Sequence, residues 1–364
     1  MLLNDDSPNR LSRRQVLATS SSFAAGALAA ANAAAADLSA DAPAGSANTS
    51  TELAPSRLAA VLAQAEALPR LHSLLIARHG RELVAARLRG PALDTPVNVK
   101  SVSKSVIAAL VGAAIGRGVL GGVDQPITTL LDGMIPQGLD PRISSITVAD
   151  LLTMQAGLER TSGPNYGSWV ASPDWVRYVL TRPFVREPGQ GMLYSTGSYH
   201  LLSVALSQVS GESTLALART WLGAPLDIQI PPWTRDPQGF YMGGNNMALA
   251  PRALLRFGEM YRQGGVYDGT QVLPADWIES SWTARTRSVF TGHGYGYGWF
   301  LVRARGYRVA YAWGYGGQMI YVVPALGLTV AITSDPNAPS GRTGYVRQLH
   351  ALMADGIIPA AEDG

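Results

Sequence analysis

Cysteine is missing from this chain of 364 residues, and only 15% of its residues are charged. Without cysteine there is no disulfide framework, no thiolate zinc site, no cysteine nucleophile and no lipid anchor on a cysteine. The formal net charge is only +3, and no block of five or more basic residues occurs, so no nucleic-acid partner is indicated. What the chain does have is hydrophobic residues, at 47%, which suffice for a large core.

Two missing motifs narrow the class of enzyme. No G-x-S-x-G sequence occurs, which argues against a Ser-His-Asp hydrolase with a nucleophile elbow. The histidines are scattered, with no H-x-x-x-H pair and no acidic cluster beside them, so a zinc hydrolase is poorly supported and neither a metal nor a cofactor is expected. We interpret each of the five as a surface or core residue: His72, His79, His200, His293 and His350.

The first 36 residues resemble a twin-arginine export signal. Residues 12–17 read SRRQVL, and a weakly apolar, alanine-rich stretch follows from Phe23 to Ala36. Small residues at Ala34 and Ala36 suit a signal peptidase, so the mature chain would begin near Asp37 and work in the periplasm or outside the cell. A disordered leader or a short buried helix is the alternative. No segment offers about 18 uninterrupted apolar residues, so no stable membrane span is expected in the mature chain.

The remaining chain predicts a linker and one folded domain. Residues 37–55 are rich in small and polar residues without periodicity, and the domain covers 56–360. An α+β fold is expected, with an antiparallel sheet built from 56–100 and 285–360 and a mainly helical region, 101–284, between them. The expected strands are residues 73–78, 82–87, 299–303, 309–313, 319–323 and 328–333, and the expected helices are residues 58–65, 101–116, 148–154, 173–179, 199–209, 214–222, 251–261 and 345–353.

An S-x-x-K motif, Ser101 to Lys104, stands at the start of a helix that is apolar on nearly all sides. Spacing of three places both side chains on one face, one turn apart. A serine hydroxyl is a poor nucleophile until a base takes its proton, and a neutral lysine amine can do so. Burial would favour that neutral form. The pattern predicts Ser101 as the acylated nucleophile and Lys104 as its general base.

The scarcity of lysine sharpens this prediction. Only Lys100 and Lys104 occur, against 27 arginines, and both lie beside the candidate nucleophile. Arginine does not give up its proton in proteins, so it cannot replace lysine as a base. An arginine bias that left two lysines at arbitrary positions is the alternative. Lys100 is interpreted as a solvated or salt-bridged neighbour.

Several stretches in order resemble the class C β-lactamase-related serine hydrolases, which include carboxylesterases, D-aminopeptidases, DD-peptidases and 6-aminohexanoate-dimer hydrolases. They are residues 97–105 (VNVKSVSKS), 146–158 (ITVADLLTMQAGL), 187–190 (EPGQ), 194–197 (YSTG) and 313–318 (WGYGGQ). The resemblance extends over roughly residues 60–355. The resemblance implies a β-lactamase/DD-peptidase-like fold, and several motifs in the correct order are more specific than any one of them.

The resemblance also implies roles for residues of the second and third motifs. Tyr194 would relay protons between the nucleophile, its base and the leaving group, with a core tyrosine as the alternative. Two backbone N–H groups would form the oxyanion hole: that of Ser101, and one from the third motif, at Gly317 or Gln318. The predicted oxyanion and substrate-binding residues are Ser101, Gly316, Gly317, Gln318, Trp313 and Tyr315.

Departures from the family pattern bear on the substrate. Thr196 stands where asparagine commonly follows Tyr-Ser, and no K-T-G sequence occurs. Trp313 and Tyr315 instead indicate an apolar or flat substrate wall. The expected activity is cleavage of small-molecule esters or short linear amides, similar to the esterase and 6-aminohexanoate-dimer hydrolase members. A β-lactamase or DD-peptidase, and a penicillin-binding sensor or inactive binding protein on the same scaffold, are the alternatives.

Overall fold

The computed structural model describes residues 50–339 and 343–364. The chain divides into two units, Met1–Ala40 and Asp41–Gly364, and every described residue belongs to the second unit. The predicted export signal and most of the predicted linker therefore lie outside the described residues. Over the described ranges, no helix has both the length and the apolar character needed to cross a membrane.

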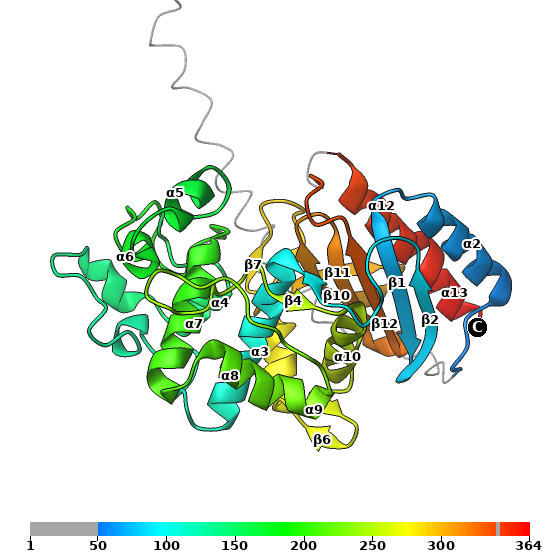
Figure 1. Cartoon of the computed structure of the whole chain (residues 1–364), viewed down its shortest axis with the longest axis horizontal. Coiled ribbons are helices and arrows are strands. Elements are labelled where there is room, and N and C mark those ends of the chain that lie inside the picture. The colour runs from blue at the N-terminus through cyan, green and yellow to red at the C-terminus, as the bar shows by residue number, and fades with distance from the viewer. Residues whose placement is uncertain (1–49, 340–342) are drawn as a thin grey trace, which may run out of the picture. The chain divides into compact units, whose positions relative to one another are not determined.

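An eight-stranded antiparallel sheet forms the centre of the second unit (Figure 1). Its strand order is β2-β1-β12-β11-β10-β9-β8-β7, so the first two strands of the chain join the last six where β1 pairs with β12. The prediction of one sheet from both chain ends is confirmed. The strands are β1 (Leu71–Arg78), β2 (Arg81–Arg87), β7 (Thr286–Arg287), β8 (Gly294–Tyr295), β9 (Phe300–Ala304), β10 (Tyr307–Gly314), β11 (Gln318–Val323) and β12 (Leu328–Ser334).

The central strands are buried along nearly their whole length because helices cover the sheet. β11 and β12 have no residue outside the buried class, which explains their continuous apolar sequences. Helix α10 (Pro251–Arg262) packs against β1, β11 and β12. Helix α2 (Pro55–Glu66) packs against β1 and against the C-terminal segment, which consists of α12 (Tyr345–Ala351), a π-helical turn at Leu352–Ile357 and α13 (Ile358–Glu362) (Figure 1).

The inserted region is mainly helical and surrounds two long helices. α3 (Ser103–Gly116) contacts α7 (Thr196–Ser210), and α7 also contacts α4, α6 and α8. The remaining helices are α4 (Val148–Leu152), α5 (Tyr166–Val170), α6 (Trp175–Leu180), α8 (Thr214–Ala218), α9 (Ala224–Leu226) and α11 (Ala275–Ser281). Single-turn helices lie at Lys100–Val102, Ile127–Thr129, Pro141–Ser145, Gly163–Asn165, Arg219–Gly223 and Pro324–Leu326, and two short ribbons pair β3 (Val97–Asn98) with β4 (Ala248–Leu249) and β5 (Val266–Tyr267) with β6 (Thr270–Gln271).

Several predicted helix boundaries differ from the structure. The helix expected from residue 101 begins as a 3₁₀ turn at Lys100–Val102, and the α-helix starts at Ser103. The helix expected over 214–222 is α-helical only to Ala218 and then widens into a π-helical turn before Pro225. Pro225 has no N–H to donate to an earlier carbonyl, so the α-helical hydrogen bonds are interrupted before the short helix α9 (Ala224–Leu226).

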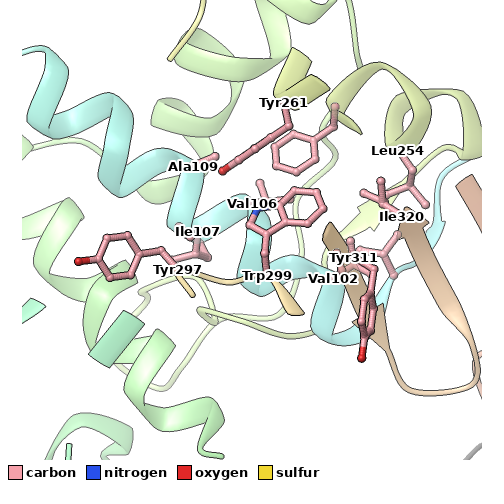
Figure 2. Packing of buried hydrophobic residues seen from close by; sticks show 14 of the residues in the cluster. Val102, Val106, Ile107, Ala109, Leu254, Tyr261, Tyr297, Trp299, Tyr311 and Ile320 are labelled. Carbon is pink, nitrogen blue, oxygen red and sulfur yellow. The ribbon is translucent and has the colours of Figure 1, made fainter. Parts of the chain in front are cut away.

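Helix α3 is buried on almost every side. All residues from Ser103 to Ala114 are buried, so the helix runs through the apolar core rather than along a surface. Figure 2 shows part of this core, where Val106 of α3 lies among the large rings of Trp299 and Tyr261. Those two rings contact each other with centroids 4.7 Å apart. Any polar group near the start of α3 therefore lies next to a water-poor interior.

Candidate active site

Ser101 and Lys104 meet at the junction between the 3₁₀ turn and α3. The Lys104 Nζ lies 3.1 Å from the Ser101 Oγ, as the spacing of three predicts. Lys100, directly before the serine, has φ +51°, in the left-handed region that side chains other than glycine seldom adopt. Its N–H donates a hydrogen bond to the Asn98 Oδ1 at 2.9 Å, which holds this bend. The turn presents the hydroxyl while the lysine stays in the core.

The amine of Lys104 is buried without an opposite charge. The residue is only 2% exposed, and its Nζ lies 2.6 Å from the Gly244 carbonyl oxygen and 3.2 Å from the Thr196 Oγ1. Burial disfavours the ammonium form and lowers the pKa of Lys104 from 10.5 to about 7. Near neutral pH, a large fraction of the amine is therefore unprotonated and able to accept a proton.

The three partners of Lys104 suit a neutral amine. An uncharged amine has two N–H donors and one lone pair, whereas an ammonium has three donors and no lone pair. The Gly244 carbonyl can only accept a hydrogen bond, and the Thr196 hydroxyl can accept the second. In the neutral form these two bonds use both donors, which leaves the lone pair for the Ser101 hydroxyl, 3.1 Å away. This arrangement is the one that a general base for Ser101 requires.

Tyr194 stands beside the same two residues. Its ring centroid lies 4.9 Å from the Lys104 Nζ. Burial raises the pKa of Tyr194 to about 12, although a hydrogen bond with Ser101 opposes the rise. The phenol therefore keeps its proton at neutral pH and can donate it. Ser101, Lys104 and Tyr194, which the sequence placed in one site, are brought together.

Thr196, which departs from the family pattern in sequence, contacts the catalytic pair in the structure. The Thr196 Oγ1 accepts a hydrogen bond from the Lys104 amine and lies 3.0 Å from the Ser162 Oγ. The Thr196 N–H donates to the Ser162 Oγ at 2.9 Å. Ser162 thus fixes both the backbone and the side chain of Thr196 at the start of α7. The feature of the sequence that could have indicated this role is the hydroxyl side chain of Thr196, two positions after the motif tyrosine Tyr194.

Gly243 and Gly244 were not predicted, and the fold explains why both are glycine. A Cβ on Gly243 would lie 1.9 Å from the Tyr199 carbonyl oxygen. Gly244 has φ +79°, and a Cβ there would lie 2.9 Å from the Lys104 Cγ. Only glycine allows this segment to come close enough to α7 and to the lysine. The Gly-Gly pair in the sequence could have indicated a close backbone approach. Its partner, Lys104, lies 140 residues away, so the sequence does not show what the pair approaches.

The third motif lies in the turn from β10 to β11, next to the nucleophile. A Cβ on Gly314 would lie 2.3 Å from the Val99 carbonyl oxygen, so this strand end passes close to the backbone just before Ser101. The Gly317 N–H donates to the Gly314 carbonyl at 3.1 Å, which closes the turn. Gly316 adopts φ +87° and lies against the Asp335 carbonyl. Of the two predicted oxyanion donors, Gly317 is therefore engaged within the turn.

The side chain of Gln318 points away from the site. It is fully buried, its Nε2 donates to the Ser334 carbonyl at 2.8 Å, and its Oε1 accepts from the Ser334 N–H at 3.1 Å. These two hydrogen bonds to β12 occupy the side chain, so only the backbone of Gln318 is left for the predicted oxyanion or substrate-binding role. The Ser334 Oγ also donates to the Gly317 carbonyl at 3.0 Å, so the start of β11 is fastened to the end of β12.

An apolar surface borders the site. Among the described residues, four large hydrophobic side chains are exposed, and three of them are Val289, Phe290 and Tyr315. The Phe290 ring contacts Tyr194 edge-on at 5.2 Å and Trp313 at 5.9 Å. We name Phe290 and Trp313 the aromatic rim, which includes one of the two residues expected to form an apolar wall.

The histidines take no direct part in this site. His200 lies fully buried on α7 with Asp236, and His293 and His350 bond to the tyrosines Tyr311 and Tyr321. Within residues 50–339 and 343–364, no group of three or more potential metal-ligating side chains occurs.

Comparison with known proteins identifies the family. The Beta-lactamase family matches residues 70–353, which is most of the chain. The chain belongs to the Beta-lactamase family. It is similar to a 6-aminohexanoate-dimer hydrolase from Paenarthrobacter ureafaciens, with 27% identity over 231 residues. That match covers 59% of this chain and 58% of the relative, so the chain spans little more than half of the curated protein's length.

Solved structures of other Beta-lactamase-like proteins confirm the predicted fold. A penicillin-binding protein homologue from Caulobacter crescentus superimposes with a TM-score of 0.65 at 20% identity, covering 84% of this chain and 99% of its own. EstCE1, a hydrolase with promiscuous acyltransferase activity, gives a TM-score of 0.67 at 19% identity, covering 83% and 97%. At such identities the likeness establishes the fold alone.

Proposed function

We propose that this protein hydrolyses esters or short linear amides through an acyl-Ser101 intermediate. Lys104 takes the hydroxyl proton of Ser101 as the oxygen attacks the substrate carbonyl. The proton then passes by way of the Tyr194 phenol to the leaving alcohol or amine as the carbon–heteroatom bond breaks. In the second half, Lys104 takes a proton from water as the water oxygen attacks the acyl carbon. Lys104 then returns this proton to the Ser101 oxygen as the acyl–oxygen bond breaks, which releases the acid and free Ser101.

The single observation that carries this proposal is the environment of the Lys104 amine. The amine is buried and hydrogen-bonded to two acceptors, and burial brings its pKa to about 7. A lysine held there for structure alone would be costly, because burial of an unpaired charge is unfavourable. Tyr194, with its pKa raised to about 12, complements it as a proton donor.

The oxyanion hole in this proposal consists of the N–H groups of Ser101 and Gln318. The Ser101 N–H lies in the first turn before α3, where helix starts leave donors free. The Gly317 N–H is engaged with Gly314, which favours Gln318 as the second donor. Its fixed side chain would keep that backbone group in place. Donors held in place before the reaction stabilise the developing negative charge.

The aromatic rim favours substrates with an apolar group next to the scissile bond. Phe290 contacts Tyr194 directly, so an acyl chain or leaving group at the active site would meet Phe290 and Trp313. The chain contains no K-T-G sequence, which β-lactamases and DD-peptidases use to hold the substrate carboxylate. Esters and the linear amides implied by the 6-aminohexanoate-dimer hydrolase relative are therefore preferred over β-lactams.

We also propose that the protein works in the periplasm or outside the cell. The support is the twin-arginine sequence at 12–17 and the small residues before Asp37. Expression of the full chain in a bacterium with an active twin-arginine pathway should yield an exported protein that begins near Asp37. Retention of the intact N-terminus in the cytoplasm would contradict this part of the proposal.

A turnover and trapping experiment tests the activity. Purified protein is mixed with p-nitrophenyl butyrate, nitrocefin and a p-nitroanilide amide, and quenched samples are analysed by peptide mass spectrometry. We expect many turnovers of the ester and one butyryl group on the peptide that carries Ser101, with both lost in Ser101→Ala. A single burst equal to the enzyme concentration would indicate a penicillin-binding sensor, and preferred cleavage of nitrocefin would indicate a β-lactamase.

The pH dependence of the reaction should follow the lysine. Since the base must be unprotonated, kcat/KM for the ester should fall about tenfold per pH unit below about pH 7 and reach a plateau above it. No alkaline decline is expected before about pH 11, because Tyr194 keeps its proton until then. Stopped-flow rates with circular dichroism at each pH provide the measurement. An acid limb centred near pH 4, the range of a carboxyl group, would point to a different base.

A further inference from the structure

A second buried ionisable pair lies behind the site, on the same helix as Thr196. His200 and Asp236 are both fully buried, and the His200 Nε2 lies 3.0 Å from the Asp236 Oδ2. The other carboxylate oxygen, Oδ1, accepts the Phe240 N–H at 2.8 Å. The rings of Trp169 and Trp175 stand edge-on to the imidazole at 5.8 and 5.3 Å. No step of the proposed reaction uses this pair.

The hydrogen bonds of His200 define where its proton resides. The Nδ1 accepts the Gly243 N–H at 3.4 Å, so this nitrogen carries no proton. The Nε2 must then be the protonated nitrogen, and it donates to Asp236. A carboxylate partner selects this tautomer because it can only accept. The imidazole thus bridges two points of the segment from Asp236 to Gly243.

That segment leads directly to the acceptor of the catalytic amine. Gly243 is bonded to His200, and the next residue, Gly244, presents its carbonyl to the Lys104 Nζ at 2.6 Å. On α7, His200 lies four residues after Thr196, the second acceptor of the same amine. The buried imidazole therefore positions both acceptors. It holds Gly244 through the hydrogen bond to the Gly243 N–H, and it is connected to Thr196 through one turn of α7.

We propose that His200 and Asp236 form a positioning pair that holds the Gly244 carbonyl, and through it the Lys104 amine, in line with the Ser101 hydroxyl. This inference rests on the proposed function, because it assigns the pair a role in delivering the lysine lone pair. A displacement of about 1 Å in a catalytic group lowers rates by up to about 100-fold. The pair acts through Lys104 and does not touch the substrate.

Asp236→Asn tests the inference with little change of volume. The amide oxygen can still accept the Phe240 N–H, so the NH₂ group then faces the His200 Nε2. The imidazole would move its proton to Nδ1, where it opposes the Gly243 N–H donor. We expect kcat for p-nitrophenyl butyrate to fall about 10- to 100-fold with KM changed less than about twofold. The ¹⁵N shifts of His200 should show the exchange of tautomers.

Two substitutions of the histidine provide a rescue test that remains valid if Asp236→Asn fails to fold. In His200→Asn the side-chain oxygen lies near the place of Nδ1 and can still accept the Gly243 N–H. In His200→Gln the amide lies near Nε2 and can bond only to Asp236. We expect His200→Asn to keep kcat within about fivefold and His200→Gln to lose about 10-fold or more. A purely structural pair would lower the stability of both and leave their kcat values alike.

The control is Asp227→Asn, an exposed carboxylate whose removal changes the net charge equally. It should leave kcat unchanged, and all variants are assayed well below their melting temperatures. If the wild type is not acylated at Ser101, the proposed function fails. If the wild type is acylated but Asp236→Asn switches tautomer and keeps wild-type kcat, or the two His200 variants have equal kcat, the positioning inference is overturned while the function stands.

Discussion

Lys104→Arg should lower kcat/KM for p-nitrophenyl butyrate by about four orders of magnitude, because it keeps the positive charge and removes the base. The Lys104 amine is the buried group aligned with the Ser101 Oγ at 3.1 Å. A guanidinium keeps its proton at every accessible pH, so it has no lone pair to offer. Initial-rate measurements with active-site titration by mass spectrometry would show both lost turnover and lost acylation.

The second lysine provides a matched control. Lys100→Arg makes the same change four residues earlier, at a partly exposed side chain whose backbone N–H is bonded to Asn98. Its activity should stay within about threefold of the wild type, as for most surface substitutions. Comparable loss in both variants would mean that positive charge or bulk near Ser101 matters in general. Near-normal activity in Lys104→Arg would remove Lys104 from the mechanism.

Lys104→Met should make the protein inactive and more stable, with a gain that depends on pH. Burial lowers the pKa of Lys104 from 10.5 to about 7, so the unfolded chain binds one more proton than the native state between these values. The stability of the wild type therefore rises with pH across this window, and the full penalty of about 5 kcal/mol applies below about pH 7. Methionine carries no such penalty and has a similar shape.

Urea unfolding at several pH values measures this effect. Near pH 7 the methionine variant should be more stable by about 2 kcal/mol, since lost hydrogen bonds offset part of the penalty. The gain should shrink by about 4 kcal/mol toward pH 10 and reverse. Lys100→Met, at a partly exposed position, is the matched control for the loss of a lysine. If the stability difference between Lys104→Met and the wild type does not change with pH, the pKa of Lys104 is not lowered in the folded protein.

The parts of the site that were predictable from the sequence are local. Ser101 and Lys104 are three residues apart on one helix, so their contact follows from helical geometry alone. The strands at both chain ends were also recognisable, because buried β-strands such as Leu328–Ser334 are runs of apolar and β-branched residues. The position of Tyr194 came only from its resemblance to a known motif, since helix geometry does not relate it to Ser101.

The parts that were missed depend on contacts distant in sequence. Gly244 meets Lys104 across 140 residues, and Asp236 meets His200 across 36 residues without any helical or strand spacing between them. A lone histidine on an apolar helix gives no sign of its partner. Gln318 was expected at the substrate because of its motif, but motif position does not determine which way a side chain turns. Its amide matches the backbone of Ser334 and bonds there instead.

The pairing of β1 with β12 has a consequence for the time at which the enzyme can form. β1 is made early and is buried along nearly all its length, yet its partner begins at Leu328, more than 250 residues later. A growing chain on the ribosome can pair β1 only with β2, so one edge of this apolar strand lacks its partner until β12 has been synthesised. The 3₁₀ turn that carries Ser101 likewise gains its neighbouring strands, β10 and β11, only when synthesis has reached Val323. The site around Ser101 can therefore form only after the chain has been synthesised beyond β11.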